Sequence, residues 1–425
     1  MTALAITGAR VIDPASGLDR HTDIWVHDGR IAALGTRPPG LPAPEPIDAT
    51  GLVVAPGLVD LCARLREPGE THKGTIASES AAALAGGITT LCCPPDTQPP
   101  LDNPATVELV RTRAETAASA HVFPVGALTR GLEGSYLAPL RALAAAGCVA
   151  VGQAGQALRD THVLRSALEY ASTLGLTVML PPADASLSRG CAHAGVMATR
   201  LGLAPIPAAA ETAELERILA LAVDTGARVH VGRLSTAGAV DLLRAARERG
   251  TPVSADVAAH QLHLTEQAVT GFNANAHLDP PLRCEADRRA LRAGVADGTI
   301  GAICSDHQPH DADAKLAPFA RTEPGLSGCE TLLALALDLA HTGECDLATT
   351  LARVTCGPAT AAGLTAGRLE VGAAADLCLF APDEVWTLSS ADMKSQGRNT
   401  PFDGVELRGR VRATSVGGEL AYRAC

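Results

Sequence analysis

The chain has 425 residues, and its 35 lysines and arginines against 46 aspartates and glutamates give a formal net charge of −11. That balance argues against a surface for nucleic acid or anionic membrane, because both are bound by clustered cations. Hydrophobic residues make up 47% and charged residues 19%, which excludes an intrinsically disordered chain and suffices for one large domain with a smaller one beside it.

Both ends of the chain are rich in predicted strands. Residues 1–55 contain short strands separated by turns, with Asp28-Gly29 as a hairpin turn. Residues 366–425 have the same character. Neither segment is long enough to bury a good core alone, so we predict that they pair into one composite β-sandwich.

Residues 56–365 alternate short apolar runs with alanine-rich helical stretches. Helix starts are marked by Asn103-Pro104 and by Thr236, whose helix should end near Gly250. Eight runs are predicted strands, namely 58–64, 88–94, 121–126, 148–152, 176–180, 228–232, 252–258 and 301–305. Eight strand–helix repeats predict an α/β fold, a (β/α)8 TIM barrel, with an open doubly wound sheet as the alternative.

The location of the protein is indicated by weaker signals. The N-terminal sequence MTALAITGARVID lacks the basic and apolar regions of a signal peptide. Apolar runs such as residues 332–340 are far shorter than the ~20 residues of a membrane span. Twelve cysteines without regular spacing are typical of free thiols in a reducing compartment. We therefore expect a cytoplasmic protein.

Barrel active sites lie at the carboxyl ends of the strands. In this chain the segments that follow the strands contain Cys62, Arg64, Arg66, Asp96, Gln153, Pro181, Arg233, Asp306 and His310. Asp279, directly before the PPLR segment, is considered with them. A site at this end of the barrel would be built from these residues and their neighbours in the same segments.

Five segments carry a family resemblance: APGLVDLCARLREPG (55–69), AAALAGGITTLCCPPDT (81–97), DPPLR (279–283), SDHQPH (305–310) and GRNTPF (397–402). Together they resemble the amidohydrolase superfamily and, more narrowly, bacterial dihydroorotases. The resemblance extends over essentially the whole chain. It implies an amidohydrolase-type barrel with a small β-sandwich made from the two termini.

The resemblance also implies which positions should hold zinc. Active members carry His-x-His after the first strand, a carboxylated lysine or an aspartate after the fourth, and histidines after the fifth and sixth. The matching residues here are Cys62, Arg64, Gln153, Pro181 and Arg233. Of the family's ligands only the aspartate after the eighth strand, Asp306, is retained.

The chemistry of these replacements argues against a metal. Zinc needs donor atoms with a free lone pair, and a guanidinium group has none and carries a permanent positive charge. Without zinc there is no activated water for hydrolysis. We therefore expect no zinc, no other cofactor and no catalytic residues. Asp306 would instead form a buried ion pair with Arg64 or Arg233.

Four residues match the family's substrate pocket. Arg66 matches a carboxylate-binding arginine and His310 a substrate-contacting histidine, and we expect structural roles for both. Asp96 and Asp279 stand where the family has asparagine, so they should place negative charge where an anionic substrate would lie. These four are remnants of a substrate pocket.

Two other arrangements remain open. His260, His263, His307 and His310 are a possible relocated metal cluster. Cys62 is a possible nucleophile, although no histidine is identifiable as its base.

The resemblance implies a catalytically inactive dihydroorotase homologue. Bacterial chains of this kind associate with the catalytic chain of aspartate transcarbamoylase. We expect a structural or regulatory subunit of that enzyme in de novo pyrimidine biosynthesis, present as a homodimer within a larger hetero-oligomer. The alternatives are an active dihydroorotase or other cyclic-amide hydrolase with an altered metal centre, and a metal-free ligand-binding sensor.

Overall fold

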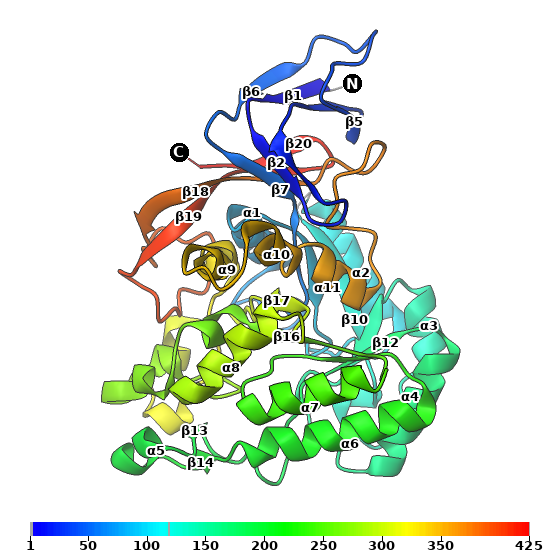
Figure 1. The fold of residues 1–425 in the computed structure, drawn as a ribbon. Coiled ribbons are helices and arrows are strands. Elements are labelled where there is room, and N and C mark those ends of the chain that lie inside the picture. The colour runs from blue at the N-terminus through cyan, green and yellow to red at the C-terminus, as the bar shows by residue number, and fades with distance from the viewer. Residues whose placement is uncertain (1–2, 118–119, 425) are drawn as a thin grey trace.

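The computed structural model describes residues 3–117 and 120–424. Eight parallel strands form a barrel below a layer of terminal strands (Figure 1). In chain order they are β8 (Leu58–Asp60), β9 (Ile88–Cys93), β10 (His121–Ala127), β11 (Ala150–Gly152), β12 (Thr177–Leu180), β15 (Val229–Val231), β16 (Val253–Ala258) and β17 (Ala302–Cys304). All eight lie at the predicted apolar runs, so the barrel prediction is confirmed.

The barrel closes between its first and last strands through the segments that follow them. Ala63 and His307 form a parallel bridge, and the Arg64 amide donates to the His307 carbonyl at 2.9 Å. The buried Asp60 carboxylate accepts from the Ser305 amide at 2.9 Å, and burial raises its pKa. The seam therefore brings the candidate residues after β8 against those after β17.

Helices surround the barrel. They are α1 (Ile76–Ala85), α2 (Pro104–Thr116), α3 (Leu140–Ala145), α4 (Thr161–Thr173), α6 (Ala209–Thr225), α7 (Ala237–Glu248), α8 (Glu285–Ala296), α9 (Leu332–His341), α10 (Leu347–Ala352) and α11 (Cys356–Ala362). The Asn103 side chain accepts from the Thr106 amide at 3.1 Å, and the Thr236 hydroxyl from the Ala239 amide at 3.3 Å. These N-caps confirm both predicted helix starts. Each one provides an acceptor for a backbone amide that has no partner within its helix.

A short insertion between β12 and α6 was not predicted. Between β12 and α6 the chain forms β13 (Ala192–His193), α5 (Val196–Leu201) and β14 (Pro205–Ile206), with β13 paired to β14. Such short elements show no measurable hydrophobic period. Short 3-10 turns connect other elements: η1 (Arg130–Leu132), η2 (Ala259–Leu262), η3 (Glu266–Phe272), η4 (Ala274–Ala276), η5 (Ala312–Lys315), η6 (Phe319–Arg321) and η7 (Cys329–Thr331).

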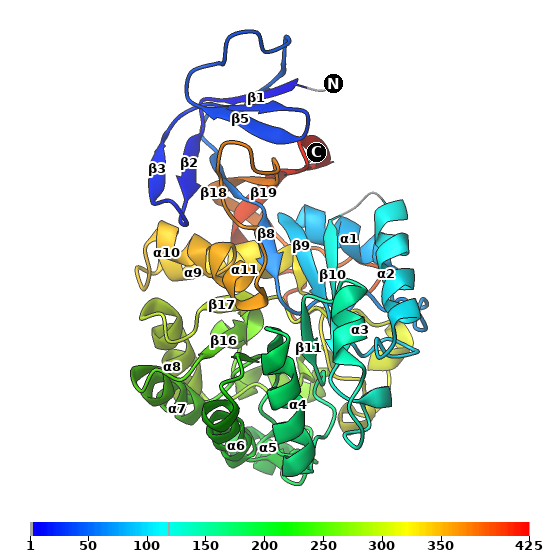
Figure 2. The ribbon, with the colours of Figure 1, turned by 90° about the vertical axis from the view of Figure 1, so that its right-hand side faces the viewer.

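The terminal segments build two sheets (Figure 2). One holds β1 (Ala3–Thr7), β4 (Ile24–His27), β5 (Arg30–Leu34) and β6 (Glu45–Asp48). The other runs β20-β19-β18-β7-β2-β3 and holds β2 (Arg10–Asp13), β3 (Leu18–His21), β7 (Val53–Pro56), β18 (Leu377–Thr387), β19 (Glu406–Val416) and β20 (Glu419–Arg423).

Strands from the two ends of the chain meet where β7 pairs with β18, and residues of both ends, among them Ile6, Val54 and Leu377, share one apolar core. The hairpin turn between β4 and β5 is confirmed, with Asp28 and Gly29 at φ of 48° and 75°. The domain boundaries at residues 55/56 and 365/366 stay predictions. No helix in the described part of the chain is long and apolar enough to cross a membrane.

Candidate functional site

The turns at the carboxyl ends of the barrel strands are unusually shaped. Arg66, Ala154, Arg233 and Asp306, which lie in segments following β8, β11, β15 and β17, have φ of 61°, 49°, 60° and 46°. Left-handed backbone is unfavourable for residues with a side chain and clusters at functional sites, where it aims side chains. The mouth of the barrel therefore has the backbone of a binding site.

Asp306 lies at the centre of this mouth, and only 2% of its surface is exposed. One oxygen, Oδ1, has the Nη1 atoms of Arg64 and Arg233 at 3.5 and 3.4 Å. The side-chain amide of Gln308 donates from Nε2 to the same oxygen at 3.1 Å. The expected ion pair is confirmed, with both arginines as partners rather than one.

Each arginine also has a second acceptor. Arg64 donates from Nε to Asp96 Oδ2 at 2.6 Å, and Arg233 donates from Nη1 to the Asp279 carbonyl at 2.7 Å. Burial alone would lower the pKa of both guanidinium groups, but the neighbouring negative charges, chiefly Asp96 for Arg64 and Asp306 for Arg233, raise it instead. Two buried cations and two carboxylates thus balance one another. The sequence indicated negative charge at Asp96, and in the structure Arg64 neutralises it.

Gln153 and Pro181 take no part in this charge network. The side-chain amide of Gln153 donates from Nε2 to Thr129 Oγ1 at 3.0 Å and to the Leu132 carbonyl at 2.9 Å. Pro181 lines a cavity of about 60 Å³ whose other walls include Leu61, Val125 and Met179. That volume is far below the ~300–1,000 Å³ of ordinary small-molecule sites.

The residues at the mouth do not fit a zinc ion. A metal bound by Asp306 would lie beside two guanidinium groups, which repel a cation and donate no lone pair. Cys62 Sγ lies 3.6 Å from Asp306 Oδ1, but burial and the nearby Asp306 charge raise the pKa of this thiol well above its usual value. A thiol held neutral is a poor ligand and a poor nucleophile, which argues against Cys62 as a zinc ligand and against the alternative that it is a nucleophile.

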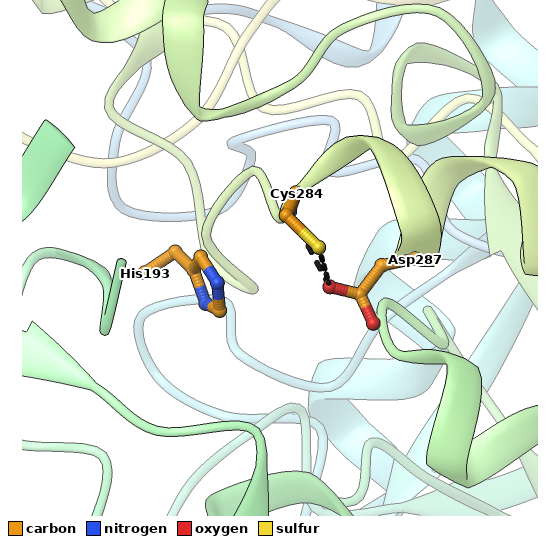
Figure 3. Close-up of side chains that lie close together, drawn as sticks. All are labelled: His193, Cys284 and Asp287. Carbon is orange, nitrogen blue, oxygen red and sulfur yellow. Dashed lines mark hydrogen bonds between the residues drawn. The ribbon is translucent and has the colours of Figure 1, made fainter. Parts of the chain in front are cut away.

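The histidines considered as a relocated metal cluster do not gather. His307 is bound to Glu79 Oε2 at 2.8 Å, and His263 lies 2.8 Å from the Leu335 carbonyl. Among residues 3–117 and 120–424, one set of three metal-type side chains has all its ligand atoms within 4.8 Å of one another: His193, Cys284 and Asp287 (Figure 3). No signal in the sequence indicated this set, because His193 is remote from the start of α8.

Two members of the set in Figure 3, Cys284 and Asp287, form a capping box at the start of α8. Cys284 donates from Sγ to Asp287 Oδ2 at 3.0 Å, and the Cys284 amide also bonds that carboxylate, at 3.3 Å. Arg283 places Nη1 at 3.2 Å from His193 Nδ1, and this buried guanidinium opposes a cation there. The set therefore lacks the electrostatics of a metal site.

Arg66 and His310 serve a network that holds the loop at residues 311–325. Arg66 donates to the Pro309 carbonyl at 2.9 Å and to Glu70 at 3.1 Å, and lies 3.2 Å from His310 Nε2. Lys73 joins Glu70 to Glu323 on that loop, with its Nζ 2.7 Å from Glu323 Oε2. Each nitrogen of the Arg66 guanidinium thus has a polar neighbour within the chain.

Substituting Glu323→Gln should loosen this loop. The side chain of Glu323 is 49% exposed, so we expect a loss of about 0.5 kcal/mol or less in the free energy of unfolding. Trypsin should nevertheless cleave faster after Lys315 or Arg321. Glu169→Gln, which removes an exposed ion pair on α4, is the control and should leave cleavage in this loop unchanged. Equal cleavage rates in wild type and Glu323→Gln would contradict the role of the Lys73 contact.

Relatives agree with this architecture. The Amidohydrolase family pattern matches residues 53–421. A protein of Pseudomonas aeruginosa described as a dihydroorotase-like protein is 51% identical over 420 residues, and one of Pseudomonas putida with the same description is 50% identical; each alignment covers 99% of both chains. A protein of Syntrophotalea carbinolica described as a dihydroorotase is 43% identical over 421 residues, with the same coverage.

Among solved structures, an L-hydantoinase (dihydropyrimidinase) from Arthrobacter aurescens superposes with a TM-score of 0.87 over 99% of this chain and 96% of that one. Its identity of 22% supports the fold alone. The family match and the identities above 40% go further. This chain belongs to the amidohydrolase family and, within it, to the dihydroorotase-like proteins.

Proposed function

We propose that this chain is a catalytically inactive dihydroorotase homologue that acts as a structural or regulatory subunit of aspartate transcarbamoylase in de novo pyrimidine biosynthesis. The observation that best supports catalytic inactivity is the contact of Arg64 and Arg233 with Asp306. Hydrolysis of a cyclic amide requires an activated water and a positively charged site for the developing oxyanion. Here the two positive charges are neutralised by Asp306 and Asp96.

The proposed role as a subunit is supported by the intact fold. The barrel, its terminal sheets and the left-handed turns at its mouth persist although the zinc-ligand positions have other residues. A chain that folds this way without hydrolytic groups is suited to a role as a scaffold. The relatives described as dihydroorotase-like support the family part of the proposal.

The sensor alternative is less well supported. The cavity at the mouth has about 60 Å³ of free space, and Arg66, the best candidate for binding an anion, is already engaged by Glu70 and Pro309. A ligand would have to displace these contacts.

The proposal is tested by purifying the chain alone and together with the aspartate transcarbamoylase catalytic chain of the same cell. We expect one complex by size-exclusion chromatography with light scattering, higher carbamoyl-transfer activity in the complex, and no ring closure of carbamoyl aspartate by either preparation of this chain. His310→Gln, at the pocket remnant, should assemble as the wild type does. Separate elution of the two chains would contradict the subunit role, and ring closure that depends on added zinc would contradict inactivity.

A further inference from the structure

A cleft of about 480 Å³ lies at the end of the barrel opposite to Asp306. Its walls include the first residues of four neighbouring strands, Thr177, Val229, Val253 and Ala302. Because the strands are parallel, these positions are remote from the carboxyl-end mouth. The cleft is therefore separate from the candidate site, and its role is independent of the proposed function.

Three arginines line this cleft: Arg228, Arg247 and Arg353. None of them forms an ion pair with a carboxylate in the part of the chain that the structure describes. Arg244, one turn from Arg247 on α7, is bound to Asp241 and Asp297 at 2.9 Å each. The three arginines therefore place positive charge on one cleft of a chain whose net charge is −11.

The contacts of the three arginines go to backbone carbonyls. Arg228 donates to Gly175, Arg247 to Gly298 and to Thr299, and Arg353 to Val295 at 3.0 Å. Each guanidinium has five N–H donors, so most of them remain available to another partner. The contacts fix the side chains without neutralising their charge.

The positive charges also act on one another. The pKa of Arg353 is lowered, first by burial and in part by the neighbouring charge of Arg247, while the charge of Asp297 acts in the opposite direction. An anion bound between them would relieve this repulsion. Several guanidinium groups around one space match the several oxygens of phosphate, to which arginine bonds bidentately.

The remaining walls leave room for an uncharged part of a ligand. They include Val229, Pro252 and Ala302, and Gly301 and Gly357 present backbone without a side chain. The volume is in the ~300–1,000 Å³ range of small-molecule sites. We propose that this cleft binds a phosphorylated small molecule through Arg228, Arg247 and Arg353.

The test is calorimetric titration of the full chain with sodium tripolyphosphate and, separately, with ATP. We expect saturable binding of one molecule per chain, weakened by added salt. The double variant Arg247→Gln/Arg353→Gln should bind at least about tenfold more weakly, since it loses two positive charges and their hydrogen bonds to the phosphate oxygens. Arg289→Gln removes an exposed positive charge on α8 that does not line the cleft, and it should bind as the wild type does.

The two probes separate the contributions of the ligand. If tripolyphosphate and ATP bind with equal affinity, the phosphates alone account for binding. If ATP binds more tightly, its nucleoside also contacts the apolar wall. Both results support the proposal. Glutamine retains a donor for the carbonyls, and if the double variant does not fold, Arg228→Gln, at an exposed position, replaces it. No saturable binding, or equal binding by wild type and the arginine variants, would overturn the proposal.

Discussion

Substituting Asp306→Asn should lower the free energy of unfolding by about 3 kcal/mol. Arg64 keeps Asp96 as a partner, but the buried guanidinium of Arg233 would be left with the Asp279 carbonyl and no carboxylate within ion-pair distance. Removing one partner of a buried ion pair costs ~3–5 kcal/mol, because the other charge stays buried and unpaired. The urea midpoint, followed by circular dichroism, measures the effect.

Two further variants make this result specific. Asp241→Asn removes an ion-paired aspartate that is 77% exposed, and its effect should be about 0.5 kcal/mol or less. Replacing the network together, by Arg64→Met, Arg233→Met, Asp306→Leu and Asp96→Asn, should give a folded protein of about wild-type stability, since apolar side chains replace buried ion pairs without loss in other proteins. A fully stable Asp306→Asn variant would show that the carboxylate does not hold the arginines.

The second large effect is a loss of stability in acid. Burial lowers the pKa of His260 and His277 to about 4, and burial together with Arg66 lowers that of His310 to about 3. Between pH 6.5 and about 4 the unfolded chain takes up protons at these histidines and the folded chain does not. Stability is therefore retained above pH 6.5 and lost as the pH falls through this window, by up to about 1.4 kcal/mol per pH unit for each histidine.

His260→Leu isolates one of these contributions. Both ring nitrogens of His260 are buried and have no hydrogen-bond partner among the described residues. The variant should lose stability less steeply between pH 6.5 and 5, and should be at least as stable as the wild type at pH 7.5.

His277→Leu is the matched comparison. Its slope should flatten in the same way, but it gives up a 2.7 Å hydrogen bond between His277 Nδ1 and Thr322, so its stability at pH 7.5 should fall. Urea unfolding at several pH values measures both quantities. An unchanged slope in the His260 variant would show that this histidine is not held neutral.

The barrel was predictable because each strand is an apolar run bounded by turn residues, and because caps such as Asn103 mark the helices. The Arg–Asp contact was predictable because the family resemblance places Arg64, Arg233 and Asp306 at positions of one metal site, where a buried carboxylate without metal needs another partner. Sequence spacing did not indicate that both arginines contact one oxygen, since that depends on side-chain conformation.

Other contacts left no signal in the sequence. The ion pair of Lys73 with Glu323 joins residues 250 positions apart, and that of Arg64 with Asp96 joins two loops whose shapes are set by packing. The β13–α5–β14 insertion is made of elements too short for a periodic pattern. These features depend on tertiary contacts and not on local sequence.

The central claim is that arginines and carboxylates occupy the mouth of the barrel in place of zinc. It is tested most directly by the metal content of the pure chain, measured by mass spectrometry after dialysis without chelator. A parallel Cys284→Ser variant removes one side chain of the set in Figure 3. The predicted result is close to zero zinc per chain in both proteins. One or two zinc ions per chain that persist in Cys284→Ser would place a metal at the mouth and contradict the claim.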